Sequence, residues 1–87
     1  MAQVQLARRA RLELLDLRWP VIDAVEEALG LLSREPHSSH ALRGRLAGLR
    51  SLRVGSFRVI YVLSDDDRTV RVVAIRHRQT AYGSDRR

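Results

Sequence analysis

Hydrophobic and polar residues alternate through most of residues 49–82, whose sequence is LRSLRVGSFRVIYVLSDDDRTVRVVAIRHRQTAY. A period of two is typical of β-strands that bury one face. Gly55-Ser56 separates two alternating runs, and glycine at the first central position favours a two-residue type II′ turn. A second turn near residues 65–69 precedes a third run. The pattern therefore predicts three antiparallel strands.

The first turn fixes the register of the first two strands and places Arg53 directly opposite Arg58. Side chains alternate between the two faces of a strand, so the apolar residues of both strands share one face. The other face carries Ser51 and the two arginines. We expect the apolar face to form the core, with Leu52, Val54, Phe57, Val59, Tyr61 and Leu63.

The second turn can be placed in two ways. A four-residue loop puts Val73 and Ile75 on the arginine side and drives Arg76 into the core. A five-residue loop puts both apolar residues in the core and Arg76 opposite Arg58. A slip of one residue moves every side chain of a strand to the other face. The apolar pattern therefore favours the five-residue loop.

This register predicts an arginine row across the sheet, formed by Arg53, Arg58 and Arg76, with Arg78 two residues further along its strand. Like charges that face each other destabilise a sheet by roughly 0.2–1 kcal/mol per pair. A bound anion would remove this cost, and the planar donor fork of arginine suits phosphate. The pattern indicates a phosphate-binding face, and the alternative is a basic face that is only solvated.

The first half of the chain predicts helices. Residues 2–6 fit either a short strand or the lead-in to a helix, and residues 7–17 carry an apolar stripe at helical spacing. Pro20 suits the first turn of a second helix. The short connection between the helices predicts an antiparallel αα-hairpin. The apolar side of the second helix comprises Val21, Ile22, Val25, Ala28, Leu29 and Leu32.

These elements predict an α+β fold in which a short N-terminal strand and an αα-hairpin pack on a small antiparallel sheet, the three-stranded C-terminal meander. At 87 residues, we expect residues 1–87 to form a single domain. The chain has no cysteine, no secretory leader pattern and no apolar run of membrane-spanning length. We therefore expect a soluble cytoplasmic protein without a membrane partner.

The charge distribution points to an anionic partner. The net charge of +6 comes from sixteen arginines and no lysine, and residues 36–64 contain no acidic residue. Such asymmetry favours nucleic acid or an acidic protein. The sequence has few aromatic residues, which argues against a general single-strand binder. His37 and His40 are the best-spaced metal ligands, but they lack suitable partners, and we expect neither a metal nor another cofactor.

The segments LRGRLAGLRSLRVGSFRVIY and VRVVAIRHRQTAY resemble the RelE/ParE superfamily of bacterial toxins. The resemblance is strongest to the RelE branch, whose members carry an Arg-Val-Gly turn, an Arg-Val-Ile-Tyr strand and a His-Arg pair before a tyrosine. It implies the toxin of a type II toxin-antitoxin pair. RelE-type members enter the ribosomal A site and cut messenger RNA without metal, by attack of a 2′-hydroxyl on the neighbouring phosphate.

The resemblance also implies roles for residues. Arg58 matches the arginine that opens the central strand, Arg76 the arginine credited with stabilising the transition state, and Tyr82 the C-terminal tyrosine. Arg53 matches the second of two basic residues on the preceding strand, and Ser51 departs from the pattern at the first. The full set that we expect to bind RNA phosphates comprises Arg43, Arg45, Arg50, Arg53 and Arg78.

The proton-transfer group is open. Arginine does not give up its proton, so Tyr82, His77 and His40 remain as candidates. Alternation from Arg76 places His77 on the core face, which favours a structural role. Tyr82 fits three roles: proton transfer, a stacking surface for a base, or a residue that only closes the edge of the core.

Apolar residues share the arginine side of the sheet in this register, namely Ile60, Val62, Val72 and Ala74. A sheet face that is basic at one end and apolar at the other is expected to be covered by a binding partner. We hypothesise that a small acidic antitoxin covers it, and the resemblance adds the ribosome and messenger RNA as partners. The main alternative is the ParE branch, which inhibits DNA gyrase without cutting RNA. A third reading is a regulatory subunit that retains only antitoxin or DNA binding.

Overall fold

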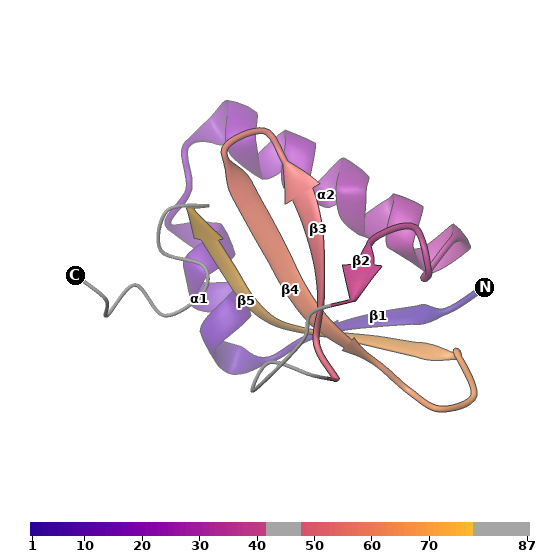
Figure 1. Ribbon diagram of the computed structural model, residues 1–87. Coiled ribbons are helices and arrows are strands. Elements are labelled where there is room, and N and C mark those ends of the chain that lie inside the picture. The colour runs from indigo at the N-terminus through magenta and orange to yellow at the C-terminus, as the bar shows by residue number, and fades with distance from the viewer. Residues whose placement is uncertain (42–47, 78–87) are drawn as a thin grey trace.

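The computed structural model describes residues 1–41 and 48–77. One mixed sheet with the strand order β1-β5-β4-β3-β2 carries both helices on the same side (Figure 1). β1 runs parallel to β5, and the other neighbouring strands are antiparallel. The predicted α+β class is confirmed. The elements are β1 (Gln3–Leu6), α1 (Arg8–Leu15), α2 (Trp19–Arg34), β2 (His40–Ala41), β3 (Arg50–Val54), β4 (Phe57–Leu63) and β5 (Thr69–His77).

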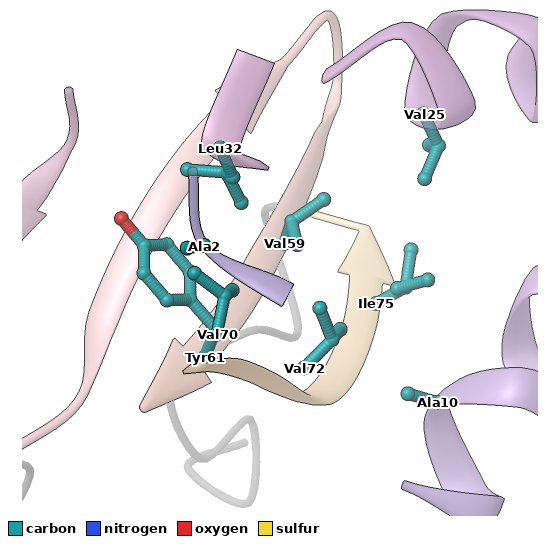
Figure 2. Packing of buried hydrophobic residues seen from close by; sticks show 9 residues of the cluster. All are labelled: Ala2, Ala10, Val25, Leu32, Val59, Tyr61, Val70, Val72 and Ile75. Carbon is teal, nitrogen blue, oxygen red and sulfur yellow. The ribbon is translucent and has the colours of Figure 1, made fainter. Parts of the chain in front are cut away.

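The helices bury one face of the sheet. Pro20 lies in the first turn of α2, as the sequence predicts. Of residues 2–6, for which the sequence allowed a strand or the start of a helix, Gln3–Leu6 form the strand that pairs with β5. No helix within the described ranges is long and apolar enough to cross a bilayer. The central core cluster contains Ala2, Ala10, Val25, Leu32, Val59, Tyr61, Val70, Val72 and Ile75 (Figure 2).

The β3–β4 turn follows the prediction. Arg53 pairs with Arg58, and Leu52 pairs with Val59. Gly55 has a φ of 59°, in the left-handed region that only glycine adopts at no steric cost. A type II′ turn has a positive φ at the first of its two central residues but not at the second, and Gly55 and Ser56 follow this pattern. This turn therefore sets the register of half the arginine row.

The β4–β5 pair contains two registers. Near the end of β5, Arg58 faces Arg76, as the five-residue loop requires. Near the turn, Tyr61 faces Val72, which is the register of the four-residue loop. The two meet at a β-bulge in which Val73 is the extra residue of β5. The prediction of one continuous register was therefore wrong, because a bulge lets each end of the strand keep its apolar residues in the core.

The turn itself closes over residues 65–68 with a hydrogen bond from the Ser64 amide to the Thr69 carbonyl. Asp67 adopts a φ of 61°, which aspartate tolerates better than most residues. The Ser64 hydroxyl, and then the Arg68 amide, donate to Asp66 and hold the pKa of that exposed carboxyl below its usual value. Both bonds favour the charged carboxylate, so they weaken only as the pH falls through this lowered pKa.

A buried hydrogen-bond chain joins the end of α2 to the sheet. Tyr61 is fully buried, and its hydroxyl donates to the Pro36 carbonyl over 2.8 Å. The Ser39 hydroxyl lies 2.5 Å from the Tyr61 hydroxyl and accepts from Arg50 Nε at 3.2 Å. Since the single Tyr61 proton goes to Pro36, Ser39 donates to Tyr61. The chain fixes residues 36–39 against β3 and β4.

We expect Tyr61→Phe to lower the free energy of unfolding by about 1–3 kcal/mol, because it removes the buried hydroxyl that bonds to the part-buried Pro36 carbonyl and Ser39 hydroxyl. Urea unfolding of wild type and variant measures the change. Ser38→Ala is the control, because it removes a hydroxyl from an exposed position of the same loop. A Tyr61→Phe variant as stable as the wild type would contradict this role of the chain.

Candidate active site

The arginine row is present across the sheet. Arg53 of β3 faces Arg58 of β4, and Arg58 faces Arg76 of β5. Alternation places all three on the face opposite the helices, which we call the arginine face. Arg53 is exposed, whereas Arg58 and Arg76 are half-buried. The row therefore concentrates positive charge on three adjacent strands, and Arg58 and Arg76 are partly shielded from water.

Glu13 of α1 reaches the end of this row. Its Oε2 accepts a hydrogen bond from Arg76 Nε at 2.7 Å, and its Oε1 accepts one from the Ile75 amide at 2.8 Å. The side chains of Glu13 and Arg76 are 23% and 26% exposed. A third contact, from Arg9 Nε to Oε2, is longer at 3.4 Å and lies on the surface. The carboxylate therefore holds both the backbone and the guanidinium at the end of β5.

The path of the chain explains why a helix supplies this carboxylate. β1 pairs with β5 only as far as Leu6 opposite Val72, and the Ala7 amide then donates to the Val72 carbonyl. Beyond that point the outer edge of β5 has no neighbouring strand among the described residues. Edge amides need another acceptor. Glu13 is that acceptor for Ile75, and the same contact brings it to Arg76.

Arg50 does not belong to the arginine face. It pairs with Tyr61, so alternation places it on the helix side of the sheet. Its Nη2 donates to the Ser39 carbonyl at 2.8 Å and to the His37 carbonyl at 3.3 Å. Arg50, which the sequence predicts as a phosphate ligand, is thus on the other face of the sheet from Arg53. Its donors hold the loop after α2.

The predicted apolar patch is also smaller than expected. Val72 lies in the core with no exposed surface, because the bulge reverses the side-chain direction of this part of β5. Ile60 is only 6% exposed. Ala74 is half-buried, and Val62 is 36% exposed. The placement of Val72 on the arginine face was therefore wrong, and Val62 is the most accessible of the four.

His77 lies where alternation predicts. It pairs with Phe57 on the helix side, and the two rings meet edge to face with centroids 5.4 Å apart. Its exposed ring thus belongs to the opposite face from Arg76. Within residues 1–41 and 48–77, no group of three or more His, Cys, Asp or Glu side chains could hold a metal. The predicted residues outside the described ranges are Arg43, Arg45, Arg78 and Tyr82.

The sequence pattern does not single out Glu13, which lies off the apolar stripe of residues 7–17. The available signal was weak: Glu13 is the only acidic residue of α1, among arginines. Its partner Arg76 is 63 residues away, and no local spacing rule links the two. Only the parallel pairing of β1 with β5, which brings α1 to the end of β5, joins them.

The arrangement suits an anion with several oxygens. Guanidinium groups bind phosphate through paired N–H donors and keep their charge at any physiological pH. Arg58 and Arg76 face each other across one strand pair, at the generic separation of roughly 5 Å between facing residues. Arginines whose Cβ atoms are this close can direct their guanidiniums to one phosphate group, and the guanidiniums can then stabilise charge that develops on its oxygens.

Known proteins are similar to this chain in both sequence and fold. The family model described as ParE toxin of type II toxin-antitoxin system, parDE, matches residues 4–82. Toxin RelG of Mycobacterium tuberculosis is 38% identical over 81 residues, which cover 91% of this chain and 93% of that protein.

Solved structures show the same similarity at the level of the fold. A chain of the toxin-antitoxin complex RelBE2 from Mycobacterium tuberculosis has a TM-score of 0.81 and 38% identity, over 88% of this chain and 98% of that chain. The isolated E. coli RelE toxin shares the fold, with a TM-score of 0.78 at 17% identity, over 99% of this chain and 94% of that chain. The chain therefore belongs to the RelE/ParE superfamily and is a toxin of a type II toxin-antitoxin system.

Proposed function

We propose that this toxin is an endoribonuclease that cuts messenger RNA on the ribosome without metal. The observation that carries the proposal is the pairing of Arg58 with Arg76 on the arginine face, with Arg53 beside them. An inhibitor that only binds protein needs positive charge, but it does not need two half-buried guanidiniums held opposite each other. Phosphoryl transfer without a metal is favoured by this arrangement, because fixed cationic donors stabilise the charge that develops on the phosphoryl oxygens.

The reaction fits the groups available. The 2′-oxygen of one nucleotide attacks the adjacent phosphorus, and the bond to the 5′-oxygen of the next nucleotide breaks. The products are a 2′,3′-cyclic phosphate and a free 5′-hydroxyl. The guanidiniums of Arg58 and Arg76 would stabilise the negative charge that grows on the phosphoryl oxygens during this step. Arginine does not exchange the proton, so we assign proton transfer to Tyr82.

Orientation of the RNA supplies a further part of the rate. A strand held with its 2′-oxygen in line with the bond that breaks reacts far faster than a freely rotating one. A small domain with one basic face has little surface with which to impose this geometry alone. We propose that the ribosome presents the RNA in the bound form, and that Arg53 contacts a neighbouring phosphate.

We also propose that a small acidic antitoxin binds this toxin. The similar chain from Mycobacterium tuberculosis is part of a toxin-antitoxin complex. The net charge of +6 favours an acidic partner. On the arginine face, the accessible apolar contacts for such a partner are Val62 and, in part, Ala74. Binding there would cover the arginine row and suppress cleavage.

The test is a map of messenger RNA 5′ ends after brief induction of the toxin, with chromosome integrity followed in the same cultures. We expect new 5′ ends inside translated codons within minutes, and intact DNA. In a purified system, toxin added to the same messenger RNA without ribosomes should leave it uncut, because the ribosome presents the RNA in the reactive geometry. Intact messenger RNA would contradict the proposal.

Inhibition of DNA gyrase is the second candidate. Two observations favour it: the matching family model carries the ParE description, and Ser51 stands where the RelE branch has a basic residue. Under this alternative the arginine row would be a docking surface for acidic protein. DNA breaks and intact messenger RNA in the same cultures would support it.

A further inference from the structure

Glu13 makes a contact that the proposed reaction does not by itself require. Its two carboxylate oxygens bind two different groups of β5, the Ile75 amide and the Arg76 guanidinium, at 2.8 and 2.7 Å. Both distances are those of well-formed hydrogen bonds, and the second is charge-assisted. Because one bond goes to the backbone, the carboxylate is anchored to the strand whose arginine it holds.

The contact is made through Nε of Arg76. A guanidinium carries its remaining donors on the terminal nitrogens Nη1 and Nη2. Because Glu13 accepts its hydrogen bond from Nε, the N–H groups on Nη1 and Nη2 remain available to bind an incoming phosphate. It also restricts a long side chain that would otherwise sample many rotamers, and fixed donors stabilise a transition state better than mobile ones.

The same carboxylate offsets charge in the free toxin. Arg58 and Arg76 face each other, and like charges in this position repel. Glu13 places a negative charge 2.7 Å from one of them. Arg9 also approaches this carboxylate, but at 3.4 Å and with a side chain 66% exposed, so water screens that interaction. Arg76 is the principal partner of Glu13.

We propose that Glu13 is a positioning residue for the cleavage reaction, which holds Arg76 through Nε so that its terminal nitrogens point at the scissile phosphate. This inference rests on the proposed nuclease function. It predicts that Glu13 acts on the chemical step through Arg76, and that it does not contribute to RNA binding directly, since a carboxylate repels phosphate.

Glu13→Gln tests the inference because it separates the two bonds. The glutamine oxygen can still accept from the Ile75 amide, but its NH2 group then faces the Arg76 Nε–H, and two donors do not bond. In single-turnover cleavage of messenger RNA on programmed ribosomes, we expect the rate at saturating toxin to fall by about 10-fold to 100-fold. The toxin concentration at half-maximal rate should change by less than about threefold.

Two further measurements separate positioning from structure. In an Arg76→Ala background, Glu13→Gln should cause no additional loss, because residues that act as a unit are not additive. In NMR spectra, the Arg76 Nε–H signal of the free wild type should exchange slowly with water and lose this protection in Glu13→Gln, while the Ile75 amide stays protected. Glu26→Gln, which removes the same charge from an exposed position of α2, should behave as wild type.

The outcomes are distinct. A wild-type maximal rate in Glu13→Gln, an equal loss in the Arg76→Ala background, or rapid exchange of the Arg76 Nε–H signal in the wild type would each overturn the positioning role and leave the nuclease function standing. The exchange measurement uses only the wild-type protein, so it still tests the positioning role if Glu13→Gln is poorly folded. A wild type that leaves messenger RNA intact would overturn the nuclease function, and the positioning role with it.

Discussion

Replacing Arg76 with alanine is expected to lower the rate of RNA cleavage by about 100-fold to 1000-fold, the usual cost of removing one fixed donor from a site that stabilises developing negative charge. The fold should persist. Glu13 keeps its bond to the Ile75 amide, and the loss of one charge-assisted hydrogen bond costs about 1.5–3 kcal/mol, which is less than the total stability of a typical domain. Single-turnover cleavage on programmed ribosomes measures the rate, and circular dichroism checks the fold.

Arg71→Ala is the matched control for this variant. Arg71 is exposed on the same strand and pairs with Val62, away from the arginine row. Its removal changes the net charge equally and should leave the saturating rate within about twofold. An Arg76→Ala toxin that keeps more than about a tenth of the wild-type rate would mean that Arg76 is not a principal donor to the transition state.

Val72→Glu is expected to abolish folding. Val72 is completely buried in the core beneath the helices (Figure 2). The substitution removes an apolar side chain and places a carboxylate where the core offers no water, at a cost of several kcal/mol. A domain of this size has a total stability of roughly 5–10 kcal/mol. We expect the variant to lack amide dispersion in NMR spectra and to show no cooperative thermal transition.

Val62→Glu makes the same substitution of valine by glutamate on the neighbouring strand, β4. Val62 is 36% exposed on the arginine face, where a carboxylate stays in water, so the cost should be about 0.5 kcal/mol or less. This pair of variants also decides the register. A sheet with one continuous five-residue register would put Val72 on the arginine face. A folded Val72→Glu protein with wild-type stability would contradict the bulge.

Much of the sheet could be predicted from its local pattern. Gly55 specifies its own turn, and the alternation around it fixes the pairing of Arg53 with Arg58. The pairing of Arg58 with Arg76 followed from the apolar residues at the end of β5. These are short-range rules, so the sequence alone predicts the arginine row correctly.

The bulge and the Glu13 contact could not be predicted in this way. Either loop length leaves some apolar residues on the wrong face, and an extra residue at Val73 resolves the conflict without any special sequence mark. The face of Arg50 was predictable, because Arg50 lies two residues before Leu52 and four before Val54 and therefore shares their side of the strand. Glu13 depends on a long-range parallel pairing, which single-sequence patterns do not encode.

The chemistry of the cut ends tests the central claim most directly. Purified toxin is incubated with ribosomes that hold a defined messenger RNA, and the termini of the fragments are identified by enzymatic end-labelling and mass spectrometry. Attack by the 2′-hydroxyl predicts a 2′,3′-cyclic phosphate or its opened 3′-phosphate on one fragment and a 5′-hydroxyl on the other, with both fragments strongly reduced in Arg76→Ala. Fragments that end in a 3′-hydroxyl and a 5′-phosphate, or uncut messenger RNA, would contradict the account.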